Sequence, residues 1–133
     1  MVKTELKTEN GIEKFYYVVD VILGTFGVYP PYSFREEFGN QKLREAKLKA
    51  LQRAKEIEII LDYQGMFFLP FASPSEFVTG KNAHYSITVS LVQEFEEDSE
   101  YSHEIYTIEG EGIDETIEAL EFEADIFKRL SIS

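Results

Sequence analysis

The sequence predicts an α+β fold, with two helices packed on one face of a mainly antiparallel sheet of about four strands. Segments 40–63 and 114–130 repeat apolar residues every three or four positions, as helices do. Segment 85–95 alternates apolar and polar residues, which is typical of a strand with one solvated face, and hence of an antiparallel sheet. The expected order is β-α-β-β-β-α, in a single domain covering residues 1–133.

Composition limits the class of protein before any motif is considered. Hydrophobic residues make up 44% of the 133 residues, which is too many for a disordered chain. The chain has no cysteine, so disulfides and cysteine-bound zinc or iron–sulfur clusters are excluded. No apolar run approaches the length of a membrane-spanning helix, and the first residues lack the apolar core of a signal peptide. We therefore expect a soluble, cytoplasmic protein with no cofactor and no membrane contact.

The amino-terminal third is expected to supply an edge segment, a central strand and the first helix. Residues 1–13 are polar and form either a frayed end or an edge strand. Residues 14–23 are apolar on both faces except at Asp20, which favours a central strand with Asp20 on its wetter face. The first helix follows, with Asn40 as a suitable N-cap. Its apolar stripe is Leu43, Ala46, Ala50, Ala54, Ile57 and Leu61, with basic residues flanking it on both sides.

Between the central strand and the first helix, residues 24–39 are expected to form an aromatic loop. Two consecutive prolines, Pro30 and Pro31, cannot donate hydrogen bonds to a sheet. The rings of this segment either cap the core or form a contact surface, because Tyr and Phe supply rigid interface area. The candidate aromatic contact surface is Phe26, Tyr29, Tyr32 and Phe34.

The second half is expected to hold a short strand, a long hairpin and the second helix. The short strand covers 66–71 and is limited by its proline. The hairpin strands cover 85–95 and 103–109, with a turn at 97–100. In the second helix, the expected buried stripe is Ile113, Ile117, Leu120, Ala124, Phe127 and Leu130, widened by Ala119, Phe122 and Ile126.

From the first helix onward, the expected order of helix, three strands and helix resembles that of double-stranded-RNA-binding domains. The resemblance concerns the order of elements alone. Those domains carry basic residues at the start of their last helix, where this chain has Asp114, Glu115 and Glu118. RNA binding is therefore not carried over, and the net charge of −12 disfavours direct binding to any nucleic acid.

Charge is distributed unevenly along the chain. Segment 82–127 contains 14 carboxylates and no Lys or Arg, whereas the rest of the chain holds all 13 basic residues and 11 acidic ones. We expect the carboxylates of the hairpin and the second helix to lie on one side of the domain and to attract a basic partner. The candidate partner-binding residues are Glu94, Glu96, Glu97, Asp98, Glu100, Asp114, Glu115, Glu118 and Glu121.

No catalytic motif and no metal site is expected. His84 and His103 lie too far apart along the hairpin to share one metal ion, although His103 can pair with Glu94 across the strands. The acidic turn lacks the glycine and the Asp-x-Asp spacing of a calcium loop. A Gly-x-Ser-x-Gly motif for a serine nucleophile is absent from the sequence.

Three functions are compatible with these observations. The first is a non-catalytic interaction module whose acidic side engages a basic partner, such as a small inhibitor or nucleic-acid mimic of viral or mobile-element origin. The second is a structural subunit of a homo-oligomer, in which the helix flanks near Lys49 and Arg53 meet the acidic side of a neighbour in a heterologous contact. The third is an enzyme or small-ligand-binding protein with a pocket under residues 24–39, using Asp20, Tyr29 or His103. Solubility alone also accounts for an acidic surface.

Overall fold

The computed structural model describes residues 3–8, 11–25, 28–39, 42–62, 66–67, 78–79, 83–95, 99–108 and 113–132. Among these, the side chains of 23–25, 28–32, 60–62, 66–67, 78–79, 83–84, 113–115 and 132 are not described. Within this part of the chain, five strands form one antiparallel sheet on which two helices pack, in the order β-β-β-α-β-β-α. The predicted α+β class is therefore confirmed.

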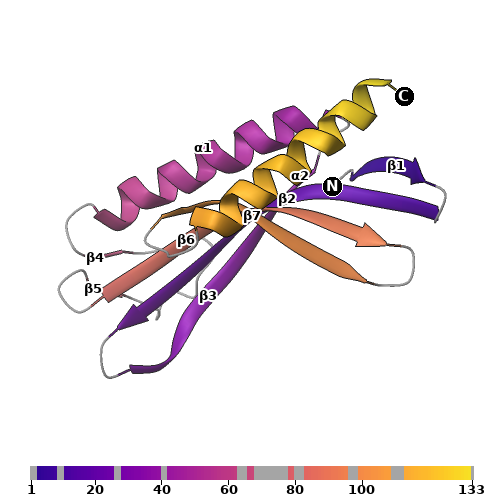
Figure 1. Ribbon diagram of the computed structural model, residues 1–133. Helices are drawn as coiled ribbons and strands as arrows, with labels where there is room; N and C mark the ends of the chain where they lie inside the picture. Colours follow the sequence, from indigo (N-terminus) through magenta and orange to yellow (C-terminus); the bar gives the residue numbers. More distant parts are fainter. Residues whose placement is uncertain are drawn as a thin grey trace.

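The central strand of the sheet is β2 (Gly11–Thr25), which is paired along both of its edges. On one side lies β6 (Ala83–Phe95), followed at the edge of the sheet by β7 (Glu100–Ile108). The other side of β2 is shared by two strands in succession (Figure 1). There, β1 (Thr4–Thr8) pairs with its beginning and β3 (Val28–Phe38) pairs with the remainder. The position expected for the central strand is confirmed.

The loop predicted at 24–39 is wrong over most of its length, because residues 28–38 form strand β3. From Ser33 onward the strand alternates, with Phe34 and Phe38 packed against the core and the residues between them more exposed. The prolines do not prevent pairing, because β3 lies at an edge of the sheet, where a missing N–H is tolerated. The pairing with β2 shifts between Leu23 and Thr25, at the level of the prolines.

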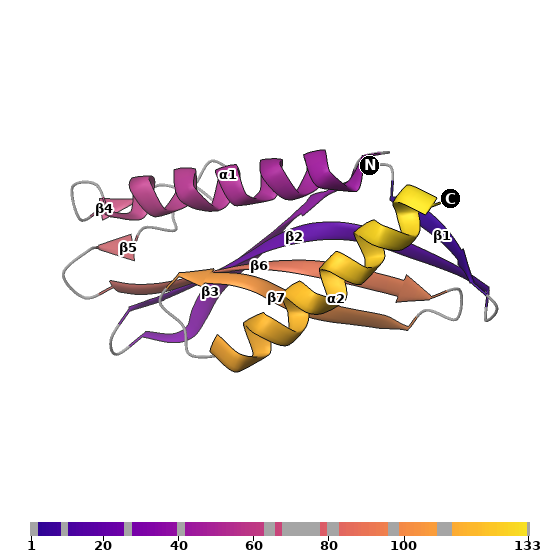
Figure 2. The same ribbon diagram turned by 45° about the horizontal axis from the view of Figure 1, so that its top comes forward.

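Both helices, α1 (Leu43–Asp62) and α2 (Ile113–Ile132), lie on the same face of the sheet and run in opposite directions (Figures 1 and 2). They approach each other where α1 begins and α2 ends, and there the Arg44 guanidinium lies 4.7 Å from the centroid of the Phe127 ring. The stripe predicted for α1 is confirmed from Leu43 to Ile57, where all five residues are buried. Asn40 lies outside the described residues, as does the side chain of Leu61.

The second helix forms where it was predicted, but a different stripe faces the sheet. Ile126 is only 1% exposed, whereas Ile117 and Leu120 are 51% and 41% exposed. The core is packed by Ala119, Phe122 and Ile126, which were expected only to widen the stripe, together with Phe127 and Leu130 of the predicted stripe, whereas Ala124 is exposed. Phe122 stacks on His103 of β7 with ring centroids 4.0 Å apart. This orientation buries Glu123, a carboxylate that periodicity alone directs to solvent. Hydrogen bonds from two other elements satisfy Glu123 and make the orientation possible.

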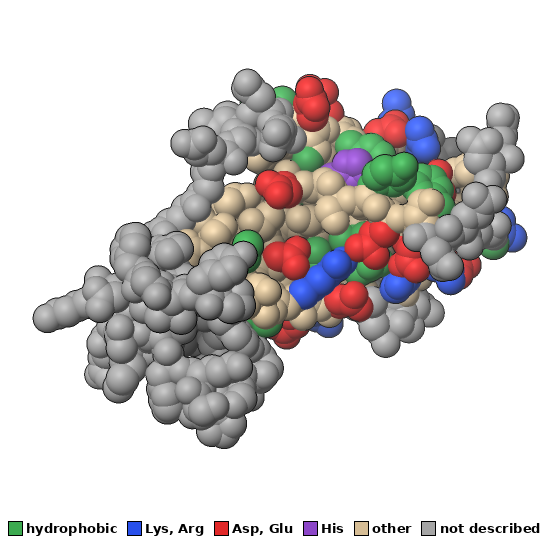
Figure 3. Space-filling model, turned by 90° about the horizontal axis from the view of Figure 1, so that it is seen from below, with side chains coloured by type: hydrophobic (Ala, Val, Ile, Leu, Met, Phe, Trp, Pro, Cys, Tyr) green, Lys and Arg blue, Asp and Glu red, His purple; other side chains and the backbone are tan. Residues whose placement is uncertain are grey.

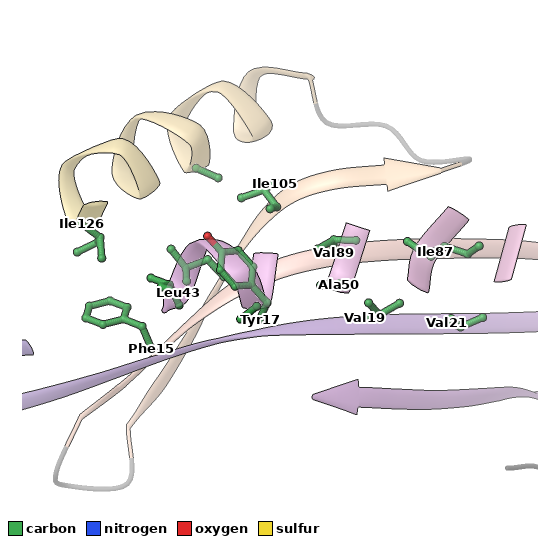
Figure 4. Close-up of a cluster of buried hydrophobic side chains, with 14 of the residues drawn as sticks. Phe15, Tyr17, Val19, Val21, Leu43, Ala50, Ile87, Val89, Ile105 and Ile126 are labelled. Carbon is green, nitrogen blue, oxygen red and sulfur yellow. The ribbon is translucent and has the colours of Figure 1, made fainter. Parts of the chain in front are cut away.

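The core lies between the helices and the sheet and is lined by odd-numbered residues of β2 and β6 (Figure 4). This arrangement confirms the alternation predicted for residues 85–95. Even-numbered residues face away from the helices, where a small second cluster forms around Tyr16, Val18 and Val92. The strand residues of the main core are Leu6, Phe15, Tyr17, Val19, Val21, Ile87, Val89, Leu91 and Ile105.

Two further strands, β4 (Met66–Phe67) and β5 (Val78–Thr79), pair with each other in a sheet of their own. The strand expected at 66–71 is thus observed only in its first two residues, and residues 68–71 lie outside the described part. In the main sheet, only β6 and β7 lie between α1 and α2, so the element order of double-stranded-RNA-binding domains is not reproduced there. Within the described residues, no helix has the length and apolarity that a membrane span requires.

Candidate functional site

The β6–β7 hairpin and α2 place the acidic residues on two different faces of the sheet. Glu94 lies directly opposite Glu100 across the hairpin, and Glu104 lies opposite Ser90. Because side chains alternate along a strand, these three carboxylates share the helix-free face with Tyr16 and Val18. The carboxylates of α2 belong to the opposite, helix-bearing side. The structure therefore brings the predicted acidic residues together in separate groups.

On the helix-free face, Glu94 and Glu100 are each held by a cation from a distant part of the chain. Lys3 Nζ donates to Glu94 Oε2 at 2.5 Å, and Arg35 Nη2 donates to Glu100 Oε1 at 2.9 Å. Two like charges directly opposite each other destabilise a strand pair, and these cations offset that repulsion. Figure 3 shows red and blue side chains of this face lying next to one another beside a tan area. Both carboxylates are thus already paired with cations of the same chain.

The hydroxyl of Tyr16 completes the group around Glu100. It donates to Glu100 Oε2 at 3.1 Å, and burial together with the nearby carboxylate raises the pKa of Tyr16 to about 12. The hydrogen bond from Arg35 is the main reason that the pKa of Glu100 lies below its ordinary value. Glu100 is therefore ionised throughout the neutral range, and its charge is balanced by Arg35 of the same chain.

On the helix side, Glu123 is buried in a network that joins β2, α1 and α2. The Tyr17 hydroxyl donates to Glu123 Oε2 at 2.5 Å, and Lys47 Nζ donates to Oε1 at 2.5 Å. Only 5% of the Glu123 side chain is exposed, and burial followed by the hydrogen bond to Glu123 raises the pKa of Tyr17 well above its ordinary value. Sequence reasoning missed this network. A carboxylate between the buried positions Ala119 and Ile126 is the only local signal for it.

Within the described part of the acidic segment 82–127, exposed carboxylates without an ion pair lie along β7 and α2. Glu104, Glu118 and Glu121 are exposed, and none of them has an ion-pair partner within the described residues. Glu104 and Glu118 line one shallow concavity of about 450 Å³. Glu121 lies one helical turn after Glu118, on the same side of α2. Because β7 is at the edge of the sheet, Glu104 on its helix-free face and Glu118 on the helix-bearing side line the same concavity. We call Glu104, Glu118 and Glu121 the acidic edge.

His103 also lines this concavity and does not pair with Glu94. It lies opposite Leu91, and its Nε2 atom is 3.4 Å from Gln93 Oε1. The predicted pair with Glu94 is wrong because β7 begins at Glu100, inside the segment expected to turn, which shifts the register. Burial lowers the pKa of His103, so its ring is neutral at neutral pH. The ring therefore offers an apolar, stacked surface between the carboxylates.

Asp20 and His103, two residues considered for a ligand pocket, lie on opposite faces of the sheet. Asp20 pairs in register with Arg35 on the helix-free face, and burial raises its pKa. A hollow of about 770 Å³ does lie near the start of α1 and the end of α2, between Arg44 and Phe127. Neither Asp20 nor His103 lines it. These two groups therefore cannot act on one ligand.

The other predicted site residues divide into three groups. Phe34 is partly buried against the core, which makes it a core-capping ring. Tyr29, Tyr32, Asp114 and Glu115 lie in β3 and α2, but their side chains are not described, nor is that of His84 in β6. Phe26, Glu96, Glu97 and Asp98 lie outside the described residues.

Neither a metal site nor a relative offers a further guide to function. Among the residues that the structure describes, no group of three or more His, Asp or Glu side chains is placed to hold a metal ion. Comparison with protein-family models, curated proteins and solved structures found no match to this chain.

Proposed function

We propose that this protein is a non-catalytic interaction module whose acidic edge engages a basic protein partner. One observation carries the proposal. The carboxylates of Glu94, Glu100 and Glu123 are all bound by cations of the same chain, whereas those of the acidic edge have no such partner among the described residues. Uncompensated charges on rigid elements attract a partner without first having to break an internal ion pair.

The geometry of the acidic edge suits a basic chain. Glu104 projects from a strand and Glu118 and Glu121 from a helix, so their positions are set by regular structure. Between them, the stacked rings of His103 and Phe122 supply an apolar surface on which the stems of Lys or Arg can lie. Each exposed pair contributes about 0.2–1 kcal/mol, so three pairs amount to roughly a 3- to 100-fold gain in affinity.

The structure separates two of the residues considered for the ligand-pocket alternative. Residues 28–38 form a strand, and Asp20 and His103 lie on opposite faces. Self-association remains compatible with the proposal, since the basic partner can be another copy of this chain.

Two matched charge-reversal variants test the proposal. The first is Glu118→Lys/Glu121→Lys. The second is Glu5→Lys/Glu37→Lys, which makes the same change in net charge at two exposed glutamates on the helix-free face. The probe is a short fluorescent peptide of alternating lysine and serine, titrated by anisotropy at low and high salt.

We expect the α2 variant to bind the peptide about 10- to 100-fold more weakly at low salt, because two attractions become two repulsions. The control variant should lose far less, and high salt should remove the differences. Equal weakening in both variants would mean that net charge alone governs binding. In that case the acidic edge would have no role beyond solubility.

A further inference from the structure

The outer surface of the helix layer carries exposed aliphatic side chains. On α1, Leu48 and Ile59 are each 66% exposed, and they point in nearly the same direction because they are separated by three helical turns. This direction is opposite to that of the buried stripe. On α2, Ile117 and Leu120 are 51% and 41% exposed. Single exposed aliphatic residues are common, but a group on one layer marks an interaction surface.

The two helices bring opposite uncompensated charges to this same surface. Arg44, Lys49 and Lys55 of α1 are exposed and have no carboxylate partner within the described residues. Glu118 and Glu121 of α2 are exposed and equally free of a cation there. The remaining charges of α1 are largely internal pairs, such as Arg53 with Glu56. The layer is therefore positive along α1 and negative along the first turns of α2.

We infer that this surface binds a second copy of the chain, with α1 of each protomer lying over α2 of the other. The inference rests on the proposed function, because Glu118 and Glu121 supply the acidic half of the contact. A two-fold axis that bisects the angle between the two helices produces this arrangement. Since α1 and α2 run in opposite directions in one chain, each α1 lies antiparallel to the partner's α2 (Figure 2).

The contact between Lys47 and Glu123 shows which positions of α1 and α2 lie at the same height along the two helices. Because α1 and α2 rise equally per residue in opposite directions, Lys49 of one copy lies at the level of Glu121 of the other, and Lys55 lies at the level of position 115. Leu48 lies at the level of Glu121 and Ala124 of the other copy by the same reasoning. Aliphatic side chains thus fill the middle of the contact, and lysines meet glutamates along its margins.

This symmetry changes the form of assembly expected from the charge pattern. A heterologous contact between helix flank and acidic side would form a ring or filament, whereas the two-fold contact closes after two copies. Each helix has 20 residues and is about 30 Å long and about 10 Å wide, so each copy presents roughly 600 Å². Standard interfaces bury about 800 Å² per partner, so we expect a dissociation constant in the micromolar range.

Charge-reversal variants of each helix, measured by light scattering during size exclusion, test the inference. Wild type at a concentration well above micromolar should have the mass of a dimer at low salt. Lys49→Glu/Lys55→Glu should be a monomer, and Glu118→Lys/Glu121→Lys should be a monomer as well. An equimolar mixture of the two variants should recover the dimer mass, because both helix contacts are then complementary. The Glu5→Lys/Glu37→Lys control should remain a dimer, and circular dichroism should show every variant folded.

Two outcomes would overturn self-association. One is a wild type that stays monomeric at low salt, and the other is a mixture of the two variants that stays monomeric although wild type dimerises. The lysine–serine peptide separates this failure from failure of the proposed function. If the α2 reversal still weakens peptide binding while wild type is a monomer, the acidic edge binds a basic protein of another kind. If neither the peptide nor a second copy responds to the α2 reversal, both proposals fail.

Discussion

Replacing Lys47 by Met should destabilise the fold far more than an ordinary lysine substitution on a helix. The Met side chain keeps the stem of Lys47 but removes its charge, which leaves the Glu123 carboxylate without a counter-ion. Glu123 is 5% exposed, and removing one partner of a buried ion pair costs about 3–5 kcal/mol. The Tyr17 hydroxyl still donates to Glu123, and the Lys47 side chain is 26% exposed, so water reaches the vacated position. We therefore expect a loss of about 3 kcal/mol, at the lower end of that range.

The assay is urea unfolding followed by circular dichroism at neutral pH. The matched control is Lys49→Met, which removes an exposed lysine from the same helix and should change stability by no more than about 0.5 kcal/mol. A triple variant, Tyr17→Phe/Lys47→Met/Glu123→Leu, should recover much of the loss, because it replaces all three polar groups by apolar ones. A loss for Lys47→Met no larger than that for Lys49→Met would refute the network as a source of stability.

Three further substitutions test other parts of the structure. In urea unfolding, Ile126→Ala should lower the free energy of unfolding by about 2–5 kcal/mol and Ile117→Ala by less than about 0.5 kcal/mol, because only Ile126 is buried. The reverse order would mean that α2 has the orientation predicted from its periodicity. Burial lowers the pKa of His103, so the unfolded chain binds this proton more tightly and the fold loses stability as pH falls below about 6.5. His103→Gln should make stability fall less steeply below this pH. If the stability of wild type and variant fell in parallel with pH, His103 would not be the cause of the decline. Arg35→Gln should cost less than about 1 kcal/mol at neutral pH, because the pair with Glu100 is more than one-third exposed. The lowered pKa of Glu100 gives stability that is present at neutral pH and lost as pH falls through that pKa. Arg35→Gln should therefore reduce the stability lost at acid pH. An equal acid-side loss in wild type and variant would contradict the role given to Arg35.

The elements that were predictable from the sequence repeat one pattern over many residues. The stripe of α1 runs over four turns from Leu43 to Ile57, and the alternation of residues 85–95 extends along a whole strand. Strand β3 was missed because two prolines outweighed the shorter alternation of residues 33–38. Prolines are compatible with an edge strand, but the position of a strand at an edge depends on the whole sheet.

The orientation of α2 and the extent of the acidic edge depend on contacts between distant residues. Glu123 can be buried because Tyr17, 106 residues away in sequence, donates a hydrogen bond to it. Glu94 is neutralised by Lys3 across 91 residues, and Glu100 by Arg35 across 65 residues. Local composition indicates a long acidic segment, but only these pairings show which of its carboxylates remain available.

Cross-linking between α1 of one copy and α2 of another tests the self-complementary helix surface most directly. The chain has no cysteine, so introduced thiols are unique. A Leu48→Cys protein is mixed with a tagged Ala124→Cys protein and a short bis-maleimide, and the control partner is a tagged Ser33→Cys protein, whose thiol is on the helix-free face. The account predicts a cross-link between positions 48 and 124 at low salt that high salt abolishes, with little product at position 33. Equal yields at positions 124 and 33, or no product at either, would contradict it.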